Sequence, residues 1–136
     1  MLNFLEDLWI MKESLVIFKR VSSEKINEQL FGGFMSAIES ISETLDTSGI
    51  SNLQIGNKKF YFLKRKNFMF IGNSNESIKE KEILKELNII ANKFFNLFPM
   101  EKFENWNGDI NSLLEFQKHI KNSLELELEK LKESLW

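Results

Sequence analysis

The chain has 136 residues and a mass of 16.1 kDa, so it is the size of one domain and can bury a core without disulfides or metals. Its 18 basic and 20 acidic residues give a formal net charge of −2, which excludes a global field that would draw it to nucleic acid. The absence of cysteine excludes a disulfide framework and a cysteine nucleophile. No apolar run approaches the roughly 18 residues of a membrane span, and the first residues lack a basic cluster. We therefore expect a soluble, cytoplasmic protein without a secretion signal.

The first part of the chain predicts a hairpin and a helix. Two apolar tetrads, residues 8–11 and 15–18, flank a three-residue polar break, which is typical of a β-hairpin. From residue 25 to residue 45, apolar residues recur every three or four positions, which predicts a helix. Its apolar face consists of Ile26, Leu30, Gly33, Phe34, Ala37, Ile38, Ile41 and Leu45.

The middle of the chain predicts a three-strand meander over residues 50–55, 60–63 and 68–71. The first of these strands mixes polar residues among its apolar ones, so we place it at a sheet edge. Gly56 begins a two-residue turn at the position where a type II′ turn needs glycine.

Two more helices follow the meander. One helical period runs from Ile83 to Phe98 and is ended by Pro99; the other follows a candidate N-cap at Asp109 and continues to Leu135. The order of elements is β-β-α-β-β-β-α-α. We expect one domain over residues 1–124 and a helical extension over residues 125–136.

Four of the five predicted strands are unbroken apolar tetrads, a pattern typical of strands that are covered on both faces. The predicted fold is therefore α/β (α+β), a three-layer α-β-α arrangement around a five-stranded, mainly antiparallel sheet. We expect the helix over residues 25–45 on one face of this sheet and the two C-terminal helices on the other.

This element order resembles the longin domain, an α-β-α module that shares its general form with profilin-like folds. The longin family places a helix with a small-residue kernel against the sheet, and the matching kernel here is residues 30–38. The resemblance covers about residues 6–124. The sister roadblock family puts a helix before its first hairpin and leaves one sheet face free. The chain stops at Trp136 with no cysteine to acylate, so the resemblance implies a stand-alone module of archaeal type and no direct fusion role.

Longin domains work through surfaces, so the resemblance implies a non-catalytic interaction module of a small-GTPase-regulatory or vesicle-trafficking-like complex. The implied partners are a small GTPase or other longin or roadblock subunits, in a homo- or heterodimer, with no nucleic acid and no direct membrane insertion. The alternative is a small-molecule sensor of profilin/PAS-like fold. A cavity lined by Phe residues beside the sheet would favour the sensor, whereas a solid core would favour the interaction module.

The residues themselves suggest no catalytic, cofactor or metal site. His119 is the only histidine and falls off the main apolar stripe, so neither a metal cluster nor a Ser-His-Asp triad can be assembled. Gly32 and Gly33 lie inside a predicted helix, which we interpret as close approach of that helix to the sheet. Five basic residues lie at the two ends of the strand at 60–63: Lys58, Lys59, Lys64, Arg65 and Lys66. We consider three roles for them: solvated charges of the turns, contact with an acidic protein or membrane surface, and contact with nucleic acid.

We place the partner surface on the edge strand and the end of the first helix, because longin domains commonly bind through that groove or pair along that edge. Its residues are Ile41, Leu45, Ile50 and Leu53. A second contact is the apolar stripe of the C-terminal extension, Leu128, Leu131 and Leu135, for which folding back onto the same domain is the alternative.

Overall fold

The computed structural model describes residues 4–12, 15–21, 28–46, 49–98, 118, 120–122 and 124–130. Its centre is a five-stranded antiparallel sheet in the order β2-β1-β5-β4-β3. The strands are β1 (Asp7–Lys12), β2 (Leu15–Arg20), β3 (Asn52–Ile55), β4 (Lys58–Arg65) and β5 (Phe68–Asn75). The helices with described bounds are α1 (Glu28–Leu45) and α2 (Glu80–Leu97), and residues 120–122 and 124–130 are also helical.

Two tight turns connect the three strands of the meander. Gly56 has φ of +62°, as expected for the glycine of a turn that the sequence places there. Between β4 and β5, Lys66 and Asn67 both have positive φ, at 51° and 67°, which is typical of a type I′ turn. The predicted edge position of β3 is confirmed, because β3 is the last strand of the described sheet and pairs there with β4.

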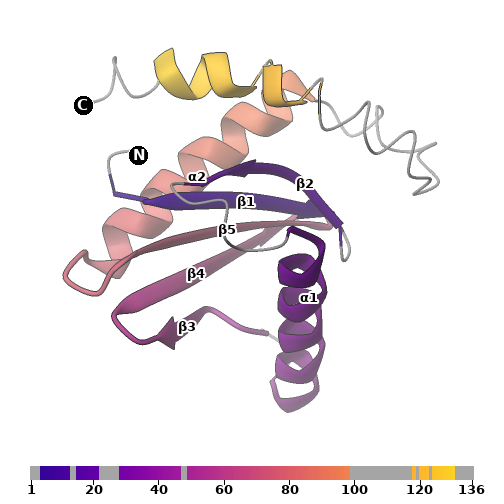
Figure 1. The fold of residues 1–136 in the computed structure, drawn as a ribbon, viewed down its shortest axis with the longest axis vertical. Coiled ribbons are helices and arrows are strands. Elements are labelled where there is room, and N and C mark those ends of the chain that lie inside the picture. Colours follow the sequence, from indigo (N-terminus) through magenta and orange to yellow (C-terminus); the bar gives the residue numbers. More distant parts are fainter. Residues whose placement is uncertain are drawn as a thin grey trace.

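The three-layer arrangement is confirmed. Figure 1 shows α1 on one side of the sheet, and α2 and the C-terminal helical segment on the other. Because side chains alternate along a strand, each strand contributes side chains to both faces of the sheet. On β5, for example, Phe68 and Phe70 enter the core beneath α2, whereas Met69 and Ile71 enter the core beneath α1. This division explains why the central strands are apolar without alternation.

The side of α1 that packs on the sheet differs from the apolar face that its periodicity suggests. Phe31 and Met35 are buried, and the Phe31 ring stacks on Trp9 with 4.2 Å between centroids. Leu30 and Phe34, which are about 100° away around the helix, are exposed. The aromatic contact with Trp9 sets the rotation of α1, and periodicity alone does not distinguish two neighbouring apolar stripes.

The expectation of close approach at the glycine pair is wrong for Gly33. That residue is exposed, and a Cβ built on it meets nothing within 4 Å. Gly72 on β5 is the glycine at which a described neighbour does come close: its Cβ would lie 2.3 Å from Cδ2 of Leu5.

Candidate interaction surface

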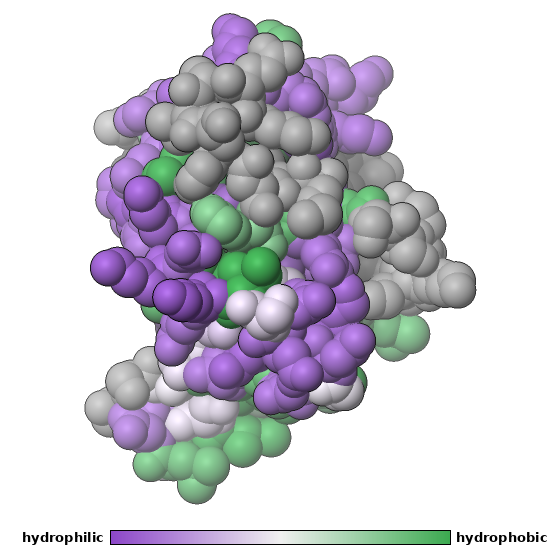
Figure 2. All heavy atoms as spheres, turned by 90° about the vertical axis from the view of Figure 1, so that its left-hand side faces the viewer, coloured by the Kyte–Doolittle hydropathy of each residue, from purple (hydrophilic) through white to green (hydrophobic). Residues whose placement is uncertain are grey.

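The outer side of α1 carries an exposed row of large apolar side chains. Leu30 is 74% exposed, Phe34 50%, Ile41 61% and Leu45 84%. Their spacing of four, seven and four residues puts them on one side of the helix, and we call them the α1 stripe. In Figure 2, green hydrophobic surface lies at the lower end of the molecule, where Figure 1 places the free end of α1. A contiguous exposed apolar row of this kind is a typical mark of a protein interaction site.

The residues that flank the α1 stripe are mostly small and uncharged. The other exposed residues of α1 are Gln29, Gly33, Ala37, Ser40, Glu43 and Thr44. The exposed acid, Glu43, contacts the Nζ of Lys64 at 2.8 Å, and this ammonium also lies 3.2 Å from Glu39. The hydrogen bond from Lys64 lowers the pKa of Glu43, and the two carboxylates raise the pKa of Lys64. Lys64 therefore balances only part of the negative charge beside the stripe, which also has the exposed Asp46 directly after Leu45.

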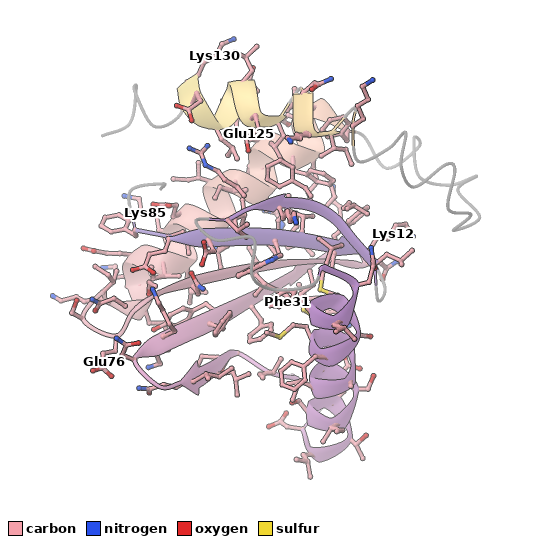
Figure 3. All side chains as sticks on the ribbon, viewed as in Figure 1. Lys12, Phe31, Glu76, Lys85, Glu125 and Lys130 are labelled. Carbon is pink, nitrogen blue, oxygen red and sulfur yellow. The ribbon has the colours of Figure 1, made fainter. Side chains whose placement is uncertain are left out.

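The inner side of α1 is the part that fixes the helix to the sheet. Figure 3 shows Phe31 projecting from the first turns of α1 toward the strands, where it lies near Trp9 and Phe60. Since this contact uses the inner side, the α1 stripe is left on the surface.

The free edge of the sheet contributes to the same hydrophobic core as α1. Residues i and i+2 of a strand share a face, and Leu53 pairs with Phe60, so Leu53 and Ile55 lie on the face that α1 occupies. Ile55 is 52% exposed, while Leu53 and Ile50 are half-buried against the core beneath α1. Among the described strands, none pairs with the outer side of β3.

The structure places the predicted surface residues in two different environments. Ile41 and Leu45 are exposed on the α1 stripe, whereas Ile50 and Leu53 are half-buried against the core beneath α1. Leu30 and Phe34 belong to the same stripe and were not assigned to the surface from sequence. The helical spacing of Leu30 and Phe34 to Ile41 indicates that they share one side of the helix. The burial of Phe31 and Met35 was needed to show that this side is the exposed one.

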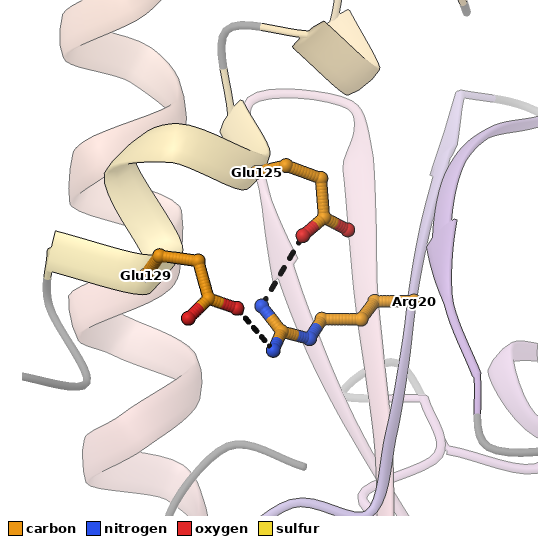
Figure 4. Close-up of polar contacts among 3 residues, drawn as sticks. All are labelled: Arg20, Glu125 and Glu129. Carbon is orange, nitrogen blue, oxygen red and sulfur yellow. Dashed lines mark hydrogen bonds and ion pairs between the residues drawn. The ribbon is translucent and has the colours of Figure 1, made fainter.

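The second predicted contact is corrected at Leu128. This side chain is fully buried in the same core as Ile120 and Leu124, on both sides of the expected domain boundary, and is therefore unavailable to a partner. Figure 4 shows Arg20 of β2 joining the same segment, with its guanidinium 3.3 Å from Glu125 and 2.7 Å from Glu129. The alternative, that this part folds back on its own domain, is the correct one for Leu128. Leu131, Leu135 and His119 lie outside the described residues.

Two observations on the described residues concern metal and ligand sites. They contain no group of three or more His, Asp or Glu residues that could hold a metal ion. A pocket of about 290 Å³ lies between α1 and the end of the β4–β5 hairpin, with a mainly polar lining, in contrast to the Phe-lined cavity that a sensor would favour. Its lining is Lys12, Glu39, Lys64, Asn67, Phe68 and Met69. No helix in the described part of the chain is long and apolar enough to cross a membrane.

Comparison with known proteins places the fold. No family model matches the sequence, and no curated protein matches it. Among solved structures, Myxococcus xanthus MglB superposes with a TM-score of 0.56 at 8% identity, over 69% of this chain and 85% of MglB. The Roadblock/LC7 domain from Streptomyces avermitilis gives a TM-score of 0.56 at 6% identity, over 73% of this chain and 88% of that domain. The chain has a longin/roadblock-like fold. The described helices lie on both faces of the sheet, as the three-layer expectation requires.

Proposed function

We propose that this longin-like domain is a non-catalytic protein-interaction module that binds its partner through the α1 stripe and the β3 edge. The observation that carries the proposal is the exposure of four large apolar side chains on one side of α1. Burying such side chains contributes roughly 1.5–3 kcal/mol each, which makes this surface the strongest source of association energy among the described residues. The edge of β3 adds backbone hydrogen bonds and a fixed direction.

The partner that we propose is a small GTPase or another longin or roadblock subunit, in a cytoplasmic GTPase-regulatory or trafficking-like complex. This assignment comes from the family resemblance. A homodimer is one form of this proposal, because a two-fold axis would bring the exposed apolar side chains of two α1 stripes together. Ile41, Leu45, Ile50 and Leu53 are the contact residues of the proposal, with Leu30, Phe34 and Ile55 added to them.

The test is a pull-down of candidate small GTPases by the wild-type chain and by Leu45→Lys, with the GTPase loaded with GDP or with a GTP analogue. Leu45 is exposed, so the substitution leaves the fold intact and removes apolar contact area. Leu126→Lys is the matched control, because Leu126 is also an exposed leucine on a helix but lies away from the α1 stripe. We expect binding that depends on the nucleotide, is lost in Leu45→Lys and is kept in Leu126→Lys. Equal binding by both variants would contradict the surface assignment.

A further inference from the structure

Residues 4–6, which we call the strap, precede β1 in the chain and lie on the α2 side of the sheet. The strap makes one ladder-type hydrogen bond, from the backbone N–H of Glu6 to the carbonyl of Asn73 at 2.9 Å. The Glu6 carboxylate also pairs with Lys58. The regular pairing of β1 with β5 begins only at Asp7, so the sheet is complete without the strap.

The Glu86 carboxylate binds the backbone of the first two strap residues. Glu86 of α2, which is 1% exposed, accepts the backbone N–H of Phe4 at 3.0 Å and that of Leu5 at 3.2 Å, one on each oxygen. Glu86 lies on the otherwise apolar inner side of α2, between Ile83 and Leu87. Two consecutive N–H groups on one carboxylate form a contact that recognises an extended backbone whatever its side chains are.

The side chain of Leu5 fills a position built for it. Gly72 lies beneath Leu5, and a Cβ there would come within 2.3 Å of Cδ2 and 3.2 Å of Cγ. Leu5 itself is fully buried in the core beneath α2. The missing side chain at residue 72 therefore creates the space that the leucine occupies.

A second polar group lies in the same region without a partner. Ser74 is two residues along β5 from Gly72 and so points to the same face of the sheet. It is fully buried, and its Oγ makes no hydrogen bond to the described residues. A carboxylate and an unsatisfied hydroxyl are out of place in a purely structural apolar core, but they are usual in a site that receives a polar backbone.

We propose that Gly72, Ser74 and Glu86 form a peptide-binding groove that the strap occupies in cis, and that an extended segment of a partner protein can replace the strap. The chemistry of the strap defines the segment: a leucine for the space over Gly72, two backbone N–H groups for Glu86, and an acidic residue after the leucine for Lys58. This groove lies on the face opposite α1, so it is a second surface that is independent of the α1 stripe.

The binding test uses the full-length chain and a fluorescent, end-blocked peptide with the sequence of residues 3–7, Asn-Phe-Leu-Glu-Asp. Leu5→Ala weakens the strap and frees the leucine space. We expect this variant to bind the peptide about tenfold or more tightly than wild type does, which corresponds to the burial of one leucine side chain. Adding Gly72→Ala to Leu5→Ala fills that space with a methyl group and should abolish the gain. A peptide with alanine in place of leucine is the ligand control.

Two outcomes would overturn the groove. One is equal affinity of the peptide for wild type, Leu5→Ala and Leu5→Ala/Gly72→Ala, and the other is no binding to Leu5→Ala. Hydrogen exchange of the wild-type chain gives a test that needs no variant. The strap must open without global unfolding, so we expect the Leu5 amide to exchange about tenfold or more faster than the Ile90 amide of α2. Exchange of both amides at the global unfolding rate would show that the strap is a fixed part of the core.

Discussion

At the scale of single residues, Glu86 is the one acidic side chain that is buried among the described residues. An ionised carboxylate loses several kcal/mol of hydration on burial, and hydrogen bonds have to offset this loss. Two backbone N–H groups, from Phe4 and Leu5, provide the offset. Burial raises the pKa of Glu86, while the N–H groups of Leu5 and Phe4 act in the opposite direction and only partly compensate.

The raised pKa of Glu86 predicts a pH dependence of stability with a definite sign. The folded chain holds the Glu86 proton more tightly than the unfolded chain, whose Glu has its ordinary value of 4.5. The stability of wild type relative to Glu86→Gln should therefore be constant below pH 4.5 and should fall as the pH rises from 4.5 through the folded-state pKa. Urea unfolding of both proteins across this range measures the difference. A difference that stays flat or rises with pH would show that the pKa is not raised.

Gly72 is closely packed and Gly33 faces open space, so replacing each with alanine should have opposite effects on stability. Gly72→Ala pushes against Leu5 and should destabilise the fold by about 1–2 kcal/mol, as overpacked core substitutions do. Gly33→Ala adds a methyl group in open space in a helix interior and should stabilise by roughly 0.5–1 kcal/mol. Chemical denaturation of the two variants makes the comparison. A loss of stability in Gly33→Ala would mean that α1 approaches another surface at this residue.

At the scale of elements, the C-terminal helical segment is part of the domain core as far as it is described. Leu124 and Leu128 are fully buried, whereas Leu126 between them is 59% exposed, which is the alternation expected of a helix packed along one side. Arg20 adds two ion pairs to the segment, but each includes a partly exposed carboxylate and contributes at most about 1 kcal/mol. Apolar burial is therefore the main force that holds the segment.

This packing predicts a large difference between two leucines that are two positions apart. Leu128→Ala should lower the free energy of unfolding by about 2–4 kcal/mol, because it leaves a cavity in the core beneath α2. Leu126→Ala should change it by no more than about 0.5 kcal/mol, because that side chain is exposed. Thermal or urea unfolding distinguishes them. Similar small losses for both variants would return Leu128 to the list of candidate partner contacts.

At the scale of the whole molecule, the sheet has two different faces. The face beneath α2 is covered by α2, the strap and the C-terminal segment, whereas α1 alone among the described helices covers the other. Leu53 of the edge strand β3 packs against the core beneath α1, and we propose that one partner contacts both the α1 stripe and this edge. The proposed association therefore uses a single side of the domain.

If that partner is a second copy, the mass of the particle in light scattering should be twice the 16.1 kDa of one chain. Leu53→Lys places a charge on the α1 face of the edge strand and should return the mass to that of a single chain while circular dichroism stays native. Asn52→Lys is the matched control, since its side chain points to the other face of the same strand. A single-chain mass for the wild type would contradict the homodimer and leave binding to a different protein as the proposal. An unchanged dimer in Leu53→Lys would exclude the β3 edge as a dimer contact.

The sequence by itself determined the element order, the edge position of β3 and the presence of helices on both faces of the sheet. These follow from local periodicity, from turn residues such as Gly56 and from unbroken apolar strands, all of which are properties of short windows of chain. Only the tertiary structure decided which side of α1 packs, because the choice between the Phe31 side and the Leu30 side depends on Trp9, which is distant in sequence. The burial of Leu128 and the contact of Glu86 with the strap were decided in the same way. Each depends on a partner far along the chain, and a periodic pattern indicates that a side chain is apolar or charged without indicating what it meets.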